Sequence, residues 1–301
     1  MRRCAVLLAL ALPLLASESA PPTLRLPNSA IPTHYTLDLT IVPEKETFDG
    51  TVDIDTQIKE PTTTLWLNST GLTIKEATFT PKGGKAIPAK PRQEGEEFLG
   101  LALDRPIRPC LGRIHIRYTG SMSRKNTNGI FTQQDGGNSY AYSDFEAISA
   151  RKAFPCFDEP GYKTPWQVTI HVPKDVMALS NNPVAHEAMG RDGLKAVQFT
   201  TTKPLPSYLI ALGVGPFEVI DAGTAGKKKT PIRIIVPRGH KAEAAYAVEV
   251  IPQLFTLLEN YFGIPYPGGP RNLDQVLEGI SIREAEKKEQ QPGVIAFLGK
   301  Y

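Results

Sequence analysis

Residues 34–58 read HYTLDLTIVPEKETFDGTVDIDTQI, and they set the period of the first part of the chain. Apolar and polar residues alternate on both sides of Asp49-Gly50, a dipeptide that is typical of turns between strands. The two arms therefore predict an antiparallel pair of strands, each with one apolar face. The apolar positions of that pair are Tyr35, Leu37, Leu39, Ile41, Val52, Ile54 and Ile58.

Further runs with strand character follow, separated by turn residues. The sequence holds 25 glycines and 27 prolines among 301 residues, an excess that favours short strands joined by turns over long helices. Strands at this spacing indicate a mainly β protein, either a β-sandwich or a large curved sheet, up to about residue 215. The expected strands cover residues 65–67, 72–79, 98–103, 113–119, 166–173, 197–201 and 208–214.

The character of the sequence changes after Phe217. Residues 232–236 predict a strand, and apolar residues at three- and four-residue steps predict a helix over residues 240–262. Pro252 is expected to kink this helix, and Gly263 is expected to end it. The apolar face of the helix is predicted to contain Ala244, Ala245, Val248, Ile251, Phe255, Leu258 and Phe262.

The last residues add little to this unit. Residues 283–291 are polar throughout and predict a solvated turn or loop, and the apolar run 294–297 predicts a final strand. One strand–helix unit and a final strand do not make a domain. Residues 216–301 are therefore expected to be an incomplete, truncated α+β domain.

The N-terminus carries a targeting pattern. Residues 1–3 are Met-Arg-Arg, and residues 4–16 form an almost unbroken apolar run, shorter than the roughly 20 residues of a membrane-crossing helix. Small residues follow at Ser17 and Ser19, so residues 1–19 are interpreted as a cleavable secretion signal, which fits better than a buried helix. The protein is expected to be exported, to the periplasm or the extracellular space, with no membrane association after cleavage.

The net charge of the chain bears on whether it binds nucleic acid. The chain has 34 Lys and Arg residues against 31 Asp and Glu residues, a net charge of +3. A charge so close to neutral excludes nucleic acid as an expected partner. The sequence leaves the oligomeric state open.

Three motif-like features receive a separate interpretation. Cys110 and Cys156 do not form a disulfide framework and are expected to be buried free thiols. Residues 186–190, His-Glu-Ala-Met-Gly, open like the helical H-E-x-x-H zinc motif, but glycine replaces the second histidine and the flanking residues predict a hairpin tip. Asn68-Ser69-Thr70 fits a glycosylation acceptor in a secreted eukaryotic protein.

Residues 142–166, YSDFEAISARKAFPCFDEPGYKTPW, combine acidic and aromatic side chains. One interpretation is an irregular connection packed by its aromatic rings, with carboxylates paired to Arg151, Lys152 or Lys163. The other is a pair of carboxylates that lines a cleft for a cationic group. The acidic residues of the segment are Asp144, Glu146, Asp158 and Glu159.

Residues 150–160, ARKAFPCFDEP, closely resemble the signature of the zinc metallopeptidases of the aminopeptidase N and puromycin-sensitive aminopeptidase type. The resemblance covers about residues 25–276 and implies a saddle-shaped N-terminal β-domain over residues 20–215. It further implies that residues 216–301 begin a thermolysin-like catalytic domain. The other matching pieces are Tyr35, Gly129-Ile130-Phe131, Ser180-Asn181-Asn182 and residues 206–212 and 261–267.

Two elements that the resemblance leads one to expect are absent from the sequence. The Gly-Ala-Met-Glu-Asn substrate motif should follow residues 273–276, but residues 278–291 contain nothing like it. The H-E-x-x-H helix, the downstream glutamate ligand and the transition-state tyrosine would all lie beyond Tyr301. The chain is therefore expected to hold no catalytic residue and no zinc ligand, zinc being the cofactor of the full-length family, and to be inactive alone.

The resemblance leaves one part of the substrate site in this chain. Family members hold the free α-amine of a peptide with a Gln-x-Glu or Gln-x-Gln pair just before the signature, and those positions are Asp144 and Glu146 here. Glu146 matches the acidic version, and Asp144 departs from the usual glutamine. Two hypotheses follow. The chain is the N-terminal portion of an exported zinc aminopeptidase, or it is a stand-alone β-sandwich module that binds peptide N-termini or a protein partner.

Overall fold

The protein, seen in a computed structural model, is described over residues 20–190, 192–265 and 295–297. The expected signal, the polar stretch 283–291 and the comparison of residues 278–291 with the substrate motif lie outside these residues. The described strands are β1 (Ala30–Thr40), β2 (Thr47–Ile58), β3 (Thr62–Asn68), β4 (Thr73–Pro81), β5 (Ile87–Glu94), β6 (Phe98–Ile107), β7 (Cys110–Ser121), β8 (Gly129–Asp135), β9 (Asn138–Asp144), β10 (Trp166–Pro173), β11 (Met177–Ser180), β12 (Val184–Met189), β13 (Leu194–Phe199), β14 (Leu212–Gly215), β15 (Phe217–Ala225), β16 (Thr230–Pro237) and β17 (Ile295–Phe297). The described helices are the short 3-10 helices η1 (Ala150–Lys152), η2 (Ser207–Leu209) and η3 (Lys241–Ala244), and the α-helix α1 (Ala245–Phe262).

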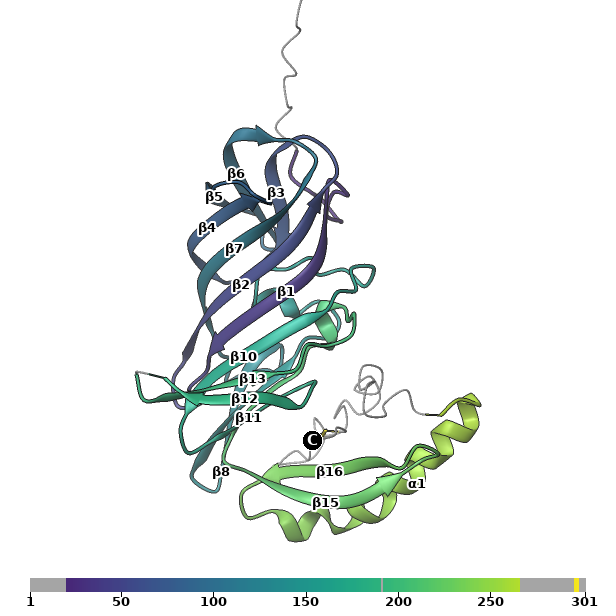
Figure 1. The fold of residues 1–301 in the computed structure, drawn as a ribbon. Helices are drawn as coiled ribbons and strands as arrows, with labels where there is room; N and C mark the ends of the chain where they lie inside the picture. The colour runs from purple at the N-terminus through teal and green to yellow at the C-terminus, as the bar shows by residue number, and fades with distance from the viewer. Residues whose placement is uncertain (1–19, 191, 266–294, 298–301) are drawn as a thin grey trace, which may run out of the picture.

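One large curved sheet forms the tall body of the molecule (Figure 1). Its ten strands follow the order β12-β13-β10-β1-β2-β7-β4-β5-β6-β3. The neighbouring strands β1 and β10 run parallel to each other. The antiparallel pair predicted from residues 34–58 is confirmed, with Leu37 opposite Val52 and Tyr35 opposite Ile54. The mainly β architecture agrees with the expected N-terminal β-sandwich.

The two-residue period separates a buried face from a solvated one. On the solvated face, polar side chains pair across β2 and β7: Arg113 Nε lies 2.7 Å from Asp55 Oδ1, and His115 Nδ1 lies 2.7 Å from Asp53 Oδ1. Burying the apolar residues of the other face removes them from water, which is the main favourable contribution to folding. The fully buried residues of this face include Leu37, Leu39, Val52, Ile54, Ile114 and Ile116.

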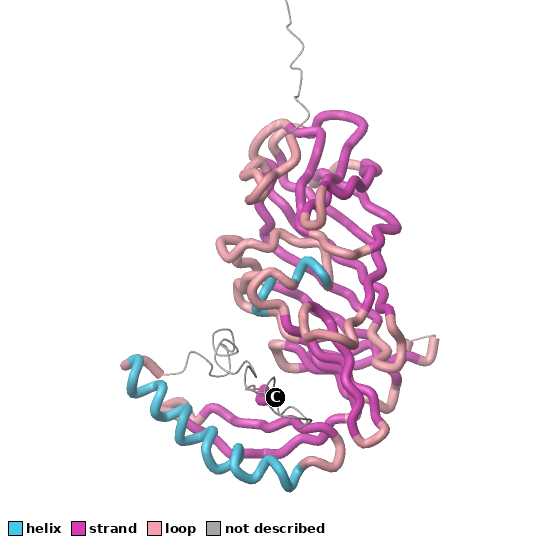
Figure 2. Tube along the Cα trace, turned by 180° about the vertical axis from the view of Figure 1, so that it is seen from behind, coloured by secondary structure: helices cyan, strands magenta, loops and turns pink. Residues whose placement is uncertain are grey.

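A second sheet carries the region of interest. Its order is β11-β14-β9-β8, and β9 runs antiparallel to both β8 and β14. Figure 2 shows loops and short helical turns gathered along one side of the large sheet, where the chain passes between the two sheets. Residues 208–214, predicted to be one strand, instead divide into the 3-10 helix η2 and the strand β14.

The third sheet, β15-β16-β17, projects from the lower end of the body together with α1 (Figure 1). The predicted strand at 232–236 and helix at 240–262 are confirmed within β16 and within η3 and α1, and β17 forms the expected final strand beside β16. Gly263 adopts a φ of +70°, the left-handed conformation that ends helices. The thermolysin-like identity of residues 216–301 and the domain boundary at 215 stay predictions.

The buried face of α1 differs from the predicted one near its end. Phe255 is buried as expected, but Leu258 and Phe262 are exposed, and Glu259 takes the buried position. The Glu259 carboxylate accepts a hydrogen bond from the Lys227 backbone N–H at 2.7 Å, which compensates for its burial. No helix within residues 20–190 and 192–265 is long and apolar enough to span a membrane.

Candidate functional site

Asp144 and Glu146 lie at the end of β9 and in the turn that follows it. Asp144 pairs with Gly129 of β8 and is half-exposed, while Glu146 is exposed in the turn, where its peptide bond to Ala147 is cis. The strand β9 ends at Asp144, so Glu146 lies outside it. Burial still alternates here, because Phe145 is buried between half-exposed Asp144 and exposed Glu146.

Phe145, between these two carboxylates, is the anchor of the turn. Its side chain is buried and packs edge-on against Phe154, with ring centroids 5.4 Å apart and planes at 87°. The Phe145 carbonyl accepts a hydrogen bond from the Ser149 backbone N–H at 2.9 Å, which closes the turn. Burial of Phe145 forces its neighbours on each side outward.

The carboxylates of Asp144 and Glu146 have no hydrogen bond or ion pair with any other side chain that the structure describes. Two carboxylates this close in sequence repel each other, and a cation beside them relieves that repulsion. Of the two interpretations of residues 142–166, pairing with a basic side chain therefore does not apply to Asp144 and Glu146 among the described residues. Their role in holding an amine stays a prediction.

Asp158, in the second half of the same segment, is a buried structural residue. Its Oδ2 accepts a hydrogen bond from Arg151 Nε at 2.9 Å, and its Oδ1 accepts one from the Ser207 hydroxyl at 2.5 Å. Arg151 also lies 3.1 Å from Glu97 Oε2 at the surface. The interpretation in which carboxylates of this segment pair with Arg151 is thus confirmed for Asp158.

Glu159 is also occupied by a structural contact, because its Oε1 accepts the Leu26 backbone N–H at 2.7 Å. The four acidic residues of the segment therefore divide into two kinds. Asp158 and Glu159 fix the polypeptide, whereas Asp144 and Glu146 are available to a ligand.

Aromatic stacking fixes the signature to the large sheet. Tyr35 of β1 stacks on Trp166 of β10, with ring centroids 3.8 Å apart, and the Tyr35 hydroxyl accepts the Phe157 backbone N–H at 2.9 Å. Burial raises the pKa of Tyr35 well above its usual value, so this hydroxyl stays neutral. The signature residues thus serve as a support for the turn that carries Glu146.

The two described cysteines are free. Cys156 is buried, and its pKa is raised well above the usual value, first by burial and then by the charge of Asp158. Cys110 is only half-buried, and partial burial raises its pKa as well. Raised pKa values disfavour the thiolate that nucleophilic chemistry needs.

Asn68 does not fit the glycosylation acceptor that its sequence motif indicates. The side chain is buried, its Oδ1 accepts the Asp158 backbone N–H at 3.1 Å, and its backbone exchanges two hydrogen bonds with Cys156. A side chain enclosed in this way cannot accept a glycan without unfolding of its surroundings. This expectation was wrong because the motif is local, whereas the partners of Asn68 are distant in sequence.

The residues present do not form a zinc site within the described ranges. His186 and Glu187 lie on the exposed edge strand β12, paired with β13, so the predicted hairpin is confirmed and the helical zinc motif is not formed. Adjacent residues of a strand point to opposite faces, so these two side chains cannot bind one ion together. No group of three His, Cys, Asp or Glu side chains among the described residues is placed to hold a metal ion.

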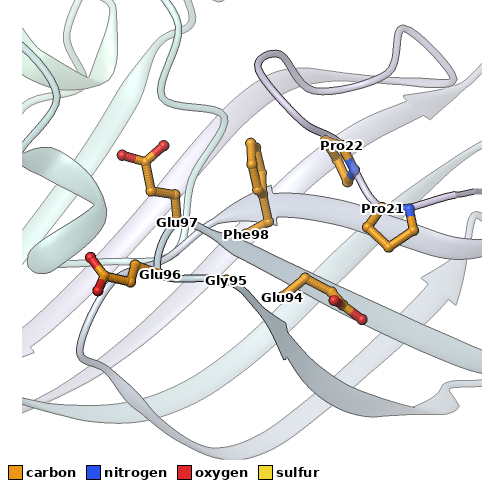
Figure 3. Close-up of a pocket in the computed structure, with 7 residues that line it drawn as sticks. All are labelled: Pro21, Pro22, Glu94, Gly95, Glu96, Glu97 and Phe98. Carbon is orange, nitrogen blue, oxygen red and sulfur yellow. The ribbon is translucent and has the colours of Figure 1, made fainter.

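A shallow pocket of about 210 Å³ lies between Pro21 and Pro22 and the turn that joins β5 to β6 (Figure 3). Its lining includes neither Asp144 nor Glu146. Glu97, on its wall, already pairs with Arg151. The pocket therefore lies beside the structural ion pair of Arg151 and Glu97 and is not part of the predicted amine site.

Comparison with known proteins identifies the family. Residues 31–209 match the family model described as the peptidase M1 N-terminal domain. Aminopeptidase M1-A of Oryza sativa subsp. japonica is 32% identical over 254 residues, which cover 81% of this chain and 28% of the relative. Puromycin-sensitive aminopeptidase of Caenorhabditis elegans is 32% identical over 251 residues, which cover 81% of this chain and 26% of the relative.

A human relative gives the same result. Endoplasmic reticulum aminopeptidase 1 is 30% identical over 254 residues, covering 81% of this chain and 27% of the relative. The chain thus spans less than a third of the length of these relatives. Because the matched domain contains β1 through η2 and with them Asp144, Glu146 and the signature, the chain belongs to the M1 peptidase family and contains its N-terminal domain.

Proposed function

We propose that this chain is the N-terminal, substrate-binding portion of an exported zinc aminopeptidase, in which Asp144 and Glu146 hold the free α-ammonium group of a peptide. The observation that carries the proposal is the pair of solvent-facing carboxylates without a side-chain partner among the described residues, at a turn fixed by buried groups. The chain alone has no hydrolytic activity in this proposal, because its sequence offers no zinc ligand set.

Electrostatics limits the affinity of such a site. One charge pair at 4 Å is worth about 4 kcal/mol near a protein surface before desolvation and screening. A half-exposed and an exposed carboxylate in contact with water retain only a fraction of that value. We therefore expect millimolar-class binding of peptide N-termini that weakens with added salt.

The amine site is tested by NMR titration with a short peptide and with the same peptide acetylated at its N-terminus. The free peptide is expected to shift the backbone amides of residues 144–148 at millimolar concentration, and the acetylated peptide is expected to leave them unchanged. Glu146→Gln should abolish the shifts, and both peptides should remain uncleaved in the sample.

Glu60→Gln is the matched control, because Glu60 is an exposed glutamate outside this turn. It should titrate like the unmodified protein. Equal shifts with both peptides, or shifts that survive Glu146→Gln, would show that the pair is a solvated surface feature.

Export is the second part of the proposal, and it rests on the basic, apolar and small residues of positions 1–19. N-terminal sequencing of the secreted protein is expected to begin near Ala20. Leu8→Arg should keep the protein inside the cell by interrupting the apolar run. Recovery of the exported protein with Met1 intact would contradict this part alone.

A further inference from the structure

The connection from β16 to α1, residues 238–244, touches the hairpin formed by β8 and β9. The Arg238 backbone N–H donates to the Tyr140 hydroxyl of β9 at 3.0 Å. His240 Nε2 lies 2.7 Å from Asp135 Oδ2, at the end of β8. These contacts join the projecting β15–β16–α1 unit to the second sheet, at the lower end of the body in Figure 1.

His240 faces a carboxylate at each ring nitrogen. Besides the contact with Asp135, its Nδ1 lies 2.7 Å from Glu243 Oε1 in η3. A neutral imidazole has one N–H donor and one lone pair, so it can donate to only one of these carboxylates. The imidazolium places a positive charge beside both: it donates to Glu243 through Nδ1 and forms an ion pair with Asp135 through Nε2. The neutral ring would turn a lone pair toward the other carboxylate.

Further charged groups lie beside His240, in addition to Asp135 and Glu243. Glu218 of β15 lies at the same corner, where its Oε2 accepts the Gly239 N–H at 2.9 Å and its Oε1 lies 3.9 Å from Lys241 Nζ. The hydrogen bond with Glu243 raises the pKa of His240 above its usual value. Desolvation opposes this increase, and the charges of Asp135 and Glu243 add to it.

We propose that His240 is a proton-controlled latch that fastens the β15–β16–α1 unit to the β8–β9 hairpin when its ring is charged. A group whose pKa is raised by folding stabilises the folded contact below its ordinary pKa, and that stabilisation is lost as the pH rises through the raised pKa. The latch is therefore closed in mildly acidic solution and released in alkaline solution.

Release of the latch leaves an apolar joint in place. Phe217, at the start of β15, packs against Tyr140 and Tyr142 of β9, with ring centroids 5.3 and 5.8 Å apart. Ile235 of β16 packs against Leu179 of β11 in the same joint. These contacts carry no charge, so the unit stays attached while the 238–244 connection loosens.

The proposal is tested by hydrogen exchange on the full chain between pH 5.5 and 9, with rates corrected for the intrinsic effect of pH. Backbone amides in residues 135–140 and 238–248 are expected to lose protection several-fold as the pH rises through the pKa of His240. NMR of the His240 ring measures that pKa in parallel. The strands β1 and β2 should keep their protection throughout.

His240→Gln should remove the pH step, since glutamine carries no charge at any of these pH values. Asp135→Asn should keep a polar side chain beside His240 but lower the pKa of His240. The pH step in protection should then move to lower pH by the same amount as the pKa. A merely structural contact would not give this coupled shift. His186→Gln, on the exposed strand β12, is the matched control and should leave the step in place.

Three results would overturn the proposal. They are a flat protection profile in the unmodified protein, a step that persists in His240→Gln, and a step that stays in place when Asp135→Asn lowers the pKa of His240. If His240→Gln also lowers protection in β1 and β2, the variant has lost its fold, and Asp135→Asn then decides the question.

Discussion

Asp158→Asn is expected to destabilise the protein by about 3–5 kcal/mol, the usual cost of removing one partner of a buried ion pair. The Asp158 side chain is completely buried, and that of Arg151 is 8% exposed, so neither charge can turn to water instead. An asparagine could still accept from Arg151 and donate to the Ser207 hydroxyl, but it would leave the buried guanidinium of Arg151 without the opposite charge of Asp158. Urea unfolding followed by the fluorescence of Trp66 and Trp166 measures the loss.

Matched variants separate the charge from the packing in this prediction. Asp175→Asn, at an exposed aspartate, should change the stability by less than about 0.5 kcal/mol. The double variant Arg151→Met/Asp158→Leu should be more stable than Asp158→Asn, because it leaves no unpaired buried charge. A loss below about 1 kcal/mol for Asp158→Asn would contradict the structural role of this pair.

The sequence signal for strands is clearest where burial alternates, as it does in β1, β2 and β10. Leu37 and Val52 lie opposite each other on the buried face, while their polar neighbours face water, so the period of two is visible in the sequence itself. The strand β5 was missed because its sequence, IPAKPRQE, has two prolines and four polar or charged residues. Its partners β4 and β6 make it a strand, and the local sequence does not reveal that pairing.

Some features of the predicted site follow from a local sequence pattern, and others are visible only in the folded structure. The alternation of exposed and buried residues around Phe145 could be inferred from neighbouring residues. The partner of Asp158 could not be chosen from sequence among Arg151, Lys152 and Lys163, because each is within reach in an irregular segment. Ser207 completes the pair from 49 residues away, a distance at which no local pattern operates.

Asn68 illustrates the same limit. Its tripeptide satisfies the acceptor pattern for glycosylation, yet its Oδ1 accepts a hydrogen bond from a backbone N–H 90 residues away. The signal that could have found this role is the strand assignment of residues 65–67, which places Asn68 at the end of a buried strand. A polar side chain in that position needs partners from the protein itself.

Trp166→Ala is expected to cost about 3–5 kcal/mol, the usual effect of removing a large aromatic side chain from a core. Trp166 is 1% exposed, stacks on Tyr35 and packs against Phe154 with ring centroids 5.4 Å apart. Because Phe154 in turn supports Phe145, the cavity would also loosen the turn between Asp144 and Glu146. Urea unfolding followed by circular dichroism measures the stability. The NMR titration with peptide shows whether the turn that carries Glu146 still responds to a peptide N-terminus.

Trp166→Phe distinguishes ring packing from the indole hydrogen bond. The indole Nε1–H donates to the Leu205 carbonyl at 3.0 Å, and that carbonyl also accepts the Thr164 backbone N–H at 3.1 Å. The carbonyl therefore keeps a partner in the phenylalanine variant, which also keeps a ring against Tyr35. Its loss of stability should be clearly smaller than that of Trp166→Ala. Equal losses in the two variants would mean that the hydrogen bond, and not the stack of Tyr35, Trp166 and Phe154, holds the signature against the large sheet.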